Sequence, residues 1–150
     1  DIEGNTLVLF NYIEKHGEPL YELINNSIDS ERKVFFVHGG TDVQDREEVR
    51  QLTEEEDNAI IIASYGTFST GINIKRLHNI IFASPSKSRI RNLQSIGRVL
   101  RKGEGKTIAT LYDIGDDING RNYTLKHLNE RVNIYREENF KHEVIKVNLR

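Results

Sequence analysis

The sequence predicts an α/β fold in which a mainly parallel sheet is flanked by helices. Short, continuous apolar runs of five or six residues recur along the chain, as expected for strands that are buried on both faces. Stretches with apolar residues at helical spacing separate most of these runs. Strands and helices that alternate in this way are typical of βαβ units, in which neighbouring strands run parallel.

Five apolar runs are the expected strands. In chain order they are residues 6–10, 33–37, 58–63, 79–83 and 107–112. In an open parallel sheet, ligands bind beyond the carboxyl ends of the strands. We therefore expect the segments that follow the first four strands to share one rim: residues 11–12, 38–40, 64–73 and 84 onward.

The segments between the strands carry helix signals. The first expected helix has Pro19 in its first turn and an apolar side formed by Leu20, Leu23 and Ile24. A second helix follows His38-Gly39-Gly40, and either Thr41 or Asp42 is suited to cap it. Residues 64–71 are expected to form a loop.

The character of the chain changes near Gly115. We expect residues 1–115 to form the main domain and residues 116–150 to form a C-terminal extension packed on that same domain. Within the extension, 3–4 spacing of apolar residues predicts a helix over 123–138. Residues 143–149 alternate enough to form a possible edge strand.

Composition excludes several classes of protein. With no cysteine, neither disulfides nor thiolate metal sites are possible, and the five histidines lack metal-ligand spacing, so we predict no metal site. No apolar run approaches the ~20 residues of a membrane span, and we predict a cytoplasmic protein with no membrane partner. The chain has no methionine, so we expect it to be part of a longer protein.

Positive charge is concentrated in one segment. The net charge is −2, yet residues 87–106 carry seven basic side chains and one acidic one. Within it, Gln94, Arg98 and Arg101 lie at i, i+4 and i+7, and therefore on one side of a helix. Paired guanidiniums favour phosphate, to which each can donate two hydrogen bonds. A solvated basic face is the alternative interpretation.

Two apparent motifs do not meet their own requirements. Gly105-Lys106-Thr107 is not a Walker A loop, because Leu100 stands where the first glycine is needed. Ser69 is not in a nucleophile elbow, because one residue too many separates it from Gly66.

Four segments in order resemble the motifs of superfamily 2 helicases. Gln-Ser-Ile-Gly-Arg-Val-Leu-Arg at 94–101 resembles their motif VI, and residues 63–73 resemble motif V. His38-Gly39-Gly40 with Arg46 resembles the element before it, and residues 7–12 resemble motif IV. The resemblance implies the second of two RecA-like domains, a three-layer sandwich. It also implies ATP and Mg²⁺ bound mainly by a first RecA-like domain of the same polypeptide, so that this chain alone is expected to be inactive.

The resemblance implies roles for particular residues. Arg98 and Arg101 are implied to be arginine fingers, with Gln94 near the nucleotide or the attacking water, and Gly71 and Asn73 belong to the nucleotide-linked part of motif V. The residues implied to contact DNA are Asn11, His38, Gly39, Arg46, Ser64 and Thr67. Each of these assignments has a purely structural alternative. In that interpretation, Gly39 and Gly71 only satisfy the geometry of a turn, and Arg46 only pairs with neighbouring acidic residues.

The resemblance implies an ATP-dependent helicase that unwinds or branch-migrates branched DNA in recombination, repair and replication restart. Its expected partners are single-stranded and branched DNA. Ser64-Tyr65, where DEAD-box proteins carry Thr-Asp, favours DNA over RNA. One alternative is a double-strand DNA translocase that does not separate strands. The other is a non-catalytic nucleic-acid-binding module, against which the intact Gln94, Arg98 and Arg101 argue.

Overall fold

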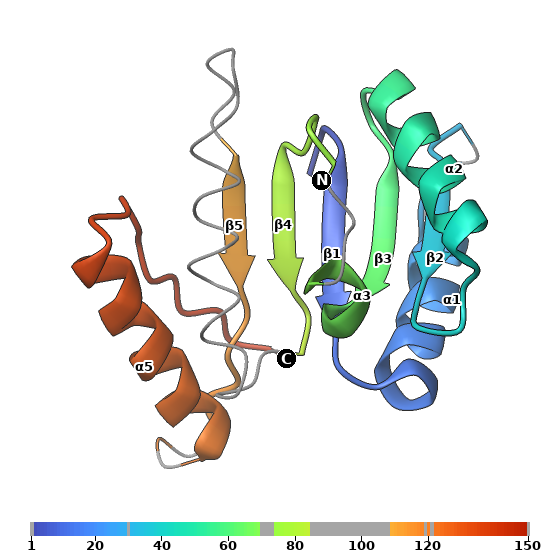
Figure 1. Ribbon diagram of the computed structural model, residues 1–150. Helices are drawn as coiled ribbons and strands as arrows, with labels where there is room; N and C mark the ends of the chain where they lie inside the picture. The colour runs from blue at the N-terminus through green and yellow to red at the C-terminus, as the bar shows by residue number, and fades with distance from the viewer. Residues whose placement is uncertain are drawn as a thin grey trace. The chain divides into compact units, whose positions relative to one another are not determined.

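A five-stranded parallel sheet forms the core of residues 1–114. The computed structural model describes residues 2–29, 31–69, 74–84, 109–118, 120 and 122–149. The strand order is β2-β3-β1-β4-β5, and every pairing is parallel (Figure 1). The strands are β1 (Thr6–Phe10), β2 (Val34–Val37), β3 (Ile60–Ser64), β4 (Asn79–Phe82) and β5 (Thr110–Asp113). The predicted sheet is confirmed, with small shifts at the strand ends.

The two central strands are the most buried because both of their faces are covered. Every residue of β1 and β3 is buried, as their continuous apolar runs predicted. Val8 and Phe10 form one core cluster with Ile60 and Ile62. Successive side chains of a strand point to opposite faces, so Leu7 and Leu9, which are fully buried, lie on the other side of β1.

The helix after β1 confirms one expectation and corrects another. A π-helical turn, η1 (Ile13–Gly17), leads into α1 (Glu18–Ser27), with Pro19 in the first turn as predicted. Leu20 and Ile24 pack on the core cluster, but Leu23 is 65% exposed. Tyr21 packs there instead, stacked on Phe36 with ring centroids 5.4 Å apart. This aromatic contact turns the helix so that its apolar side is centred between Leu20 and Tyr21, away from Leu23.

Two further helices follow β2 and β3. Asp42 caps α2 (Val43–Glu55) by accepting a hydrogen bond from the backbone N–H of Gln44 at 2.8 Å. The predicted loop after β3 is instead the short helix α3 (Tyr65–Ser69), which lies at the carboxyl ends of β1 and β3 (Figure 1). A local hydroxyl, that of Ser64, accepts from the backbone N–H of Thr67 at 3.3 Å, which stabilises a helical turn over a loop.

The chain separates into two compact units, Asp1–Ile114 and Gly115–Arg150. In the second unit, α5 (Tyr123–Glu137) confirms the predicted helix, and Tyr135 contacts the ring of Phe140 at 6.3 Å. The possible edge strand over 143–149 is not formed. These residues are exposed and belong to no strand of the described chain. A strand needs a neighbouring strand to bond its backbone groups, and an alternating sequence alone does not supply one. The packing of this extension on the main domain remains a prediction.

No helix within the described ranges is long and apolar enough to cross a membrane.

Candidate functional site

The parallel register brings the predicted rim residues to one end of the sheet. Phe10 pairs with Ser64, and Val37 pairs with Ala63, so Asn11 and His38 both follow strand ends at the level of Ser64. Figure 1 shows the arrowheads of all labelled strands pointing to the same end. The sequence predicted this shared rim, and the strand pairing confirms its placement for the described residues.

Asn11 connects the ends of two neighbouring strands. Its backbone N–H donates to Ser84 Oγ at 2.9 Å, and its side-chain amide donates to the backbone carbonyl of Ser84. Ser84 follows β4, which pairs with β1. The amide therefore holds the loops after β1 and β4 together, which positions the rim as well as contributing a polar group to it.

The loop after β2 is closed by hydrogen bonds around His38. Its backbone N–H donates to Thr41 Oγ1 at 3.0 Å, and its ring Nδ1 accepts from the backbone N–H of Gly40 at 3.1 Å. The ring also contacts Phe36, with centroids 5.2 Å apart. The ring of His38 is thus fixed at the start of the loop, and the exposed tip of the loop is Gly39.

Gly39 has no structural reason to be glycine within the described chain. Its φ is not in the left-handed region, where the described glycines are Gly4 and Gly120. A Cβ added to Gly39 would meet nothing within 4 Å. The alternative that Gly39 serves only turn geometry is therefore not supported. An open, side-chain-free backbone is suited to the close approach of a ligand.

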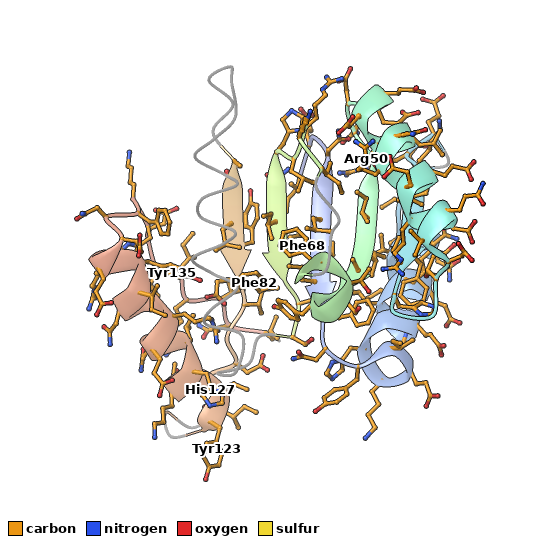
Figure 2. The ribbon with its side chains drawn as sticks, viewed as in Figure 1. Arg50, Phe68, Phe82, Tyr123, His127 and Tyr135 are labelled. Carbon is orange, nitrogen blue, oxygen red and sulfur yellow. The ribbon has the colours of Figure 1, made fainter. Side chains whose placement is uncertain are left out.

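Two arginines one turn apart on α2 have different surroundings. Arg50, which is labelled in Figure 2, belongs to α2. It pairs with Glu47 at 2.5 Å and with Glu54 at 2.8 Å. The hydrogen bond from Arg50 lowers the pKa of Glu47 below its usual value. Arg46 donates from Nε to the carbonyl of Thr41 at 3.1 Å and, across the described residues, forms no ion pair. Its charge is held near the rim without a carboxylate partner.

The hydroxyls of Ser64 and Thr67 face one another. Both side chains are buried, and their oxygens lie 2.7 Å apart. They therefore hold the turn from β3 into α3, whereas the exposed residue of that turn is Gly66. A Cβ added to Gly66 would also meet nothing within 4 Å. The sequence analysis gave Gly66 no role, although glycine inside a helix costs about 1 kcal/mol relative to alanine and could have marked it.

The residues predicted to act on the nucleotide cannot be placed. Gly71, Asn73, Gln94, Arg98 and Arg101 lie outside the described residues. Among the described side chains, no group of three or more histidines and acids is positioned to hold a metal ion.

Comparison with known proteins relates the chain to helicases. The model of the helicase conserved C-terminal domain matches residues 1–103. The ATP-dependent DNA helicase UvsW of enterobacteria phage T4 is 40% identical over 160 residues, which cover 98% of this chain and 31% of that protein. The chain thus spans about a third of the length of this relative.

Solved structures give the same relation. The crystal structure of T4 UvsW matches with a TM-score of 0.69 and 38% identity, over 91% of this chain and 29% of that one. Domain 2 of the DEAD-box helicase Mss116p, solved bound to an RNA duplex, matches with a TM-score of 0.60 and 14% identity over 73% of this chain and 41% of that one. The likeness to UvsW confirms the RecA-like fold. The Mss116p match, at 14% identity, supports the fold and nothing beyond it.

Proposed function

The chain belongs to the helicase conserved C-terminal domain family, and from this premise we propose that it is the second motor domain of an ATP-dependent DNA helicase. In this proposal it works with a first RecA-like domain of the same polypeptide. The complete protein unwinds or branch-migrates branched DNA in recombination, repair and replication restart. The identity to UvsW, a DNA helicase, supports DNA as the nucleic acid.

The observation that carries the proposal is the rim at the carboxyl ends of the strands. It presents the exposed Gly39, the exposed Gly66 at the start of α3 and, within the described chain, the charge of Arg46 without a carboxylate partner, and internal hydrogen bonds hold these segments in place. Backbone groups and single arginines bind phosphates without distinguishing bases. A motor must hold DNA of any sequence as it moves, so this arrangement suits a phosphate track.

Asn11, His38, Ser64 and Thr67 then have two kinds of role on this track. Asn11 and His38 fix the loops after β1 and β2 while lying on the rim itself. Ser64 and Thr67 use their hydroxyls on each other, so they support the turn that presents Gly66 to the DNA. We propose that this turn supports the track, and that the phosphate contacts beside it come from Gly39 and Arg46.

The nucleotide side of the proposal depends on the sequence pattern and the family match. Arg98 and Arg101 act as arginine fingers on ATP held by the first domain, with Gln94 positioning the attacking water, and Gly71 and Asn73 link the nucleotide to the DNA track. ATP and Mg²⁺ are assigned mainly to the first domain, because no Walker A loop occurs in this sequence. Charge stabilisation by an arginine finger contributes ~10³–10⁵ in rate. Fingers that act across two domains couple hydrolysis to domain closure.

The experiment is the DNA-stimulated ATPase rate of the full-length protein for wild type, Arg98→Ala and Arg101→Ala. Arg91→Ala, in the same basic segment but outside the motif, is the matched control. We expect each finger variant to lose at least ~100-fold in turnover, about 2.7 kcal/mol of barrier, with folding and DNA affinity retained. Unchanged turnover in both finger variants would show that these arginines are only a basic surface. A strand-displacement assay on wild type then separates a helicase from a translocase.

A further inference from the structure

Tyr12 is an exposed aromatic residue on the rim. It follows Asn11 directly at the carboxyl end of β1, the central strand, and its side chain is 64% exposed. Asn11 is itself bonded to Ser84 after β4. Tyr12 therefore lies at the carboxyl end of the strand that stands between β3 and β4, on the rim that carries the proposed phosphate track.

The backbone and ring of Tyr12 are held by the π-helical turn η1. The carbonyl of Tyr12 accepts from the backbone N–H groups of His16 at 2.9 Å and Gly17 at 3.1 Å. Its ring meets the ring of His16 in a T-shaped contact, with centroids 5.3 Å apart. The ring is thus supported by a neighbour on one side while much of it remains open to solvent.

Gly17 fixes the turn against the core. A Cβ at this position would lie 2.6 Å from the ring of Phe10, a fully buried residue of β1. Only glycine allows the turn to approach the strand this closely, and that approach determines where Tyr12 stands. π-Helical turns occur frequently at functional sites, and this one holds an aromatic ring at the edge of a candidate binding surface.

We propose that Tyr12 stacks on an unpaired base of single-stranded DNA whose phosphates lie along the rim. This inference rests on the proposed function and makes its ligand more specific. Proteins that bind single strands combine a phosphate-binding surface with aromatic rings on which bases stack, whatever the base. Because the bases of a duplex are stacked inside it, a base can reach Tyr12 only from an unpaired strand. The rim is therefore a track for single-stranded DNA.

The first test uses the absence of tryptophan from the chain. Tyr12→Trp introduces one fluorophore on the rim, and Tyr123→Trp, at a tyrosine of α5 that is 79% exposed, is the matched control. Each variant is titrated at low salt with oligo(dT) of about twelve nucleotides and with an abasic strand of the same length and charge. We expect oligo(dT) to quench emission from position 12 and leave position 123 unchanged, and the abasic strand to quench neither.

The second test measures affinity by fluorescence anisotropy for wild type, Tyr12→Ala and Tyr12→Phe. Loss of one stacked base predicts ~5–150-fold weaker binding of oligo(dT) by Tyr12→Ala. Its affinity for the abasic strand and for duplex DNA should match wild type, and Tyr12→Phe should retain binding of oligo(dT). Circular dichroism checks that each variant is folded.

Three results would overturn the inference. If wild type binds oligo(dT) and the abasic strand equally and Tyr12→Ala matches it, Tyr12 does not stack, while the proposed DNA binding stands. Equal quenching at position 12 by both strands would assign Tyr12 to the sugar-phosphate backbone. If wild type binds neither strand, the stacking and the proposed DNA track both fail.

Discussion

At the amino ends of the strands, two polar side chains make several internal hydrogen bonds each, whereas the carboxyl ends combine internally bonded side chains with exposed groups such as Tyr12 and Gly39. Asn5, immediately before β1, is fully buried and donates to the carbonyls of Thr53, Glu56 and Arg76 at 3.0, 2.6 and 3.0 Å. Its Oδ1 accepts from the backbone N–H of Ala59 at 2.8 Å.

Arg32 gives the amino end a second set of internal bonds. It donates to the carbonyls of Ile2, Gly4 and Asn58 at 2.8, 3.2 and 2.9 Å. At the carboxyl end, in contrast, the side chain of Arg46 makes one hydrogen bond within the described chain, to the carbonyl of Thr41, and Tyr12 is 64% exposed. The same sheet thus concentrates internal hydrogen bonds at its amino end and leaves exposed groups at its carboxyl end, where we propose that DNA binds.

The largest effect is expected at the amino end. Asn5→Ala would leave buried backbone groups without partners, and we expect it to lower the free energy of unfolding by about 3–5 kcal/mol. Urea denaturation of the variant measures this. Asn26→Ala, at an exposed position of α1, is the control and should change stability by less than about 0.5 kcal/mol. A loss below about 1 kcal/mol for Asn5→Ala would remove the distinction between the two ends.

Substitutions at Gly17 and Gly39 are expected to affect different properties, stability in the first case and DNA affinity in the second. Gly17→Ala places a methyl group against Phe10, and we expect overpacking to cost about 1–3 kcal/mol of stability. Gly39→Ala enters open space, so its stability should stay within about 0.5 kcal/mol of wild type. Its affinity for single-stranded DNA should fall roughly fivefold, about 1 kcal/mol. Denaturation and anisotropy measured on both variants test this, and unchanged DNA affinity in Gly39→Ala would exclude close approach of DNA at that loop.

The smallest expected effect is on DNA affinity, and it should differ between Arg46 and Arg50, the two arginines of α2. Arg46→Gln should weaken DNA binding by roughly 3–10-fold, and should reduce the slope of log affinity against log salt by ~0.7, the value for one phosphate contact on a single strand. Arg50→Gln is the control, because Glu47 and Glu54 already neutralise Arg50. Anisotropy titrations over a range of salt concentrations measure both slopes. A slope for Arg46→Gln equal to that of wild type would place Arg46 outside the track.

The sequence by itself determined the five strands and the three longer helices α1, α2 and α5, in their order. Apolar runs such as residues 6–10 predicted strands covered on both faces, and Pro19 and the pair Thr41-Asp42 marked helix starts through local backbone chemistry. The ordered motifs also predicted the family. The roles of Gln94, Arg98 and Arg101 remain predictions, since they lie outside the described residues.

Only the tertiary structure decided which groups are used internally and which face outward. Leu23 is exposed because the contact of Tyr21 with Phe36 turns α1, and the hydroxyls of Ser64 and Thr67 bond to each other. The sequence does not distinguish Gly17 from Gly39. In the structure, a Cβ added to Gly17 would clash with the ring of Phe10, whereas a Cβ added to Gly39 would meet nothing within 4 Å. Burial and hydrogen-bond partners depend on residues that are distant in the chain. Local sequence patterns therefore predict where a strand ends, but not which side chains at that end remain exposed after the rest of the chain has packed.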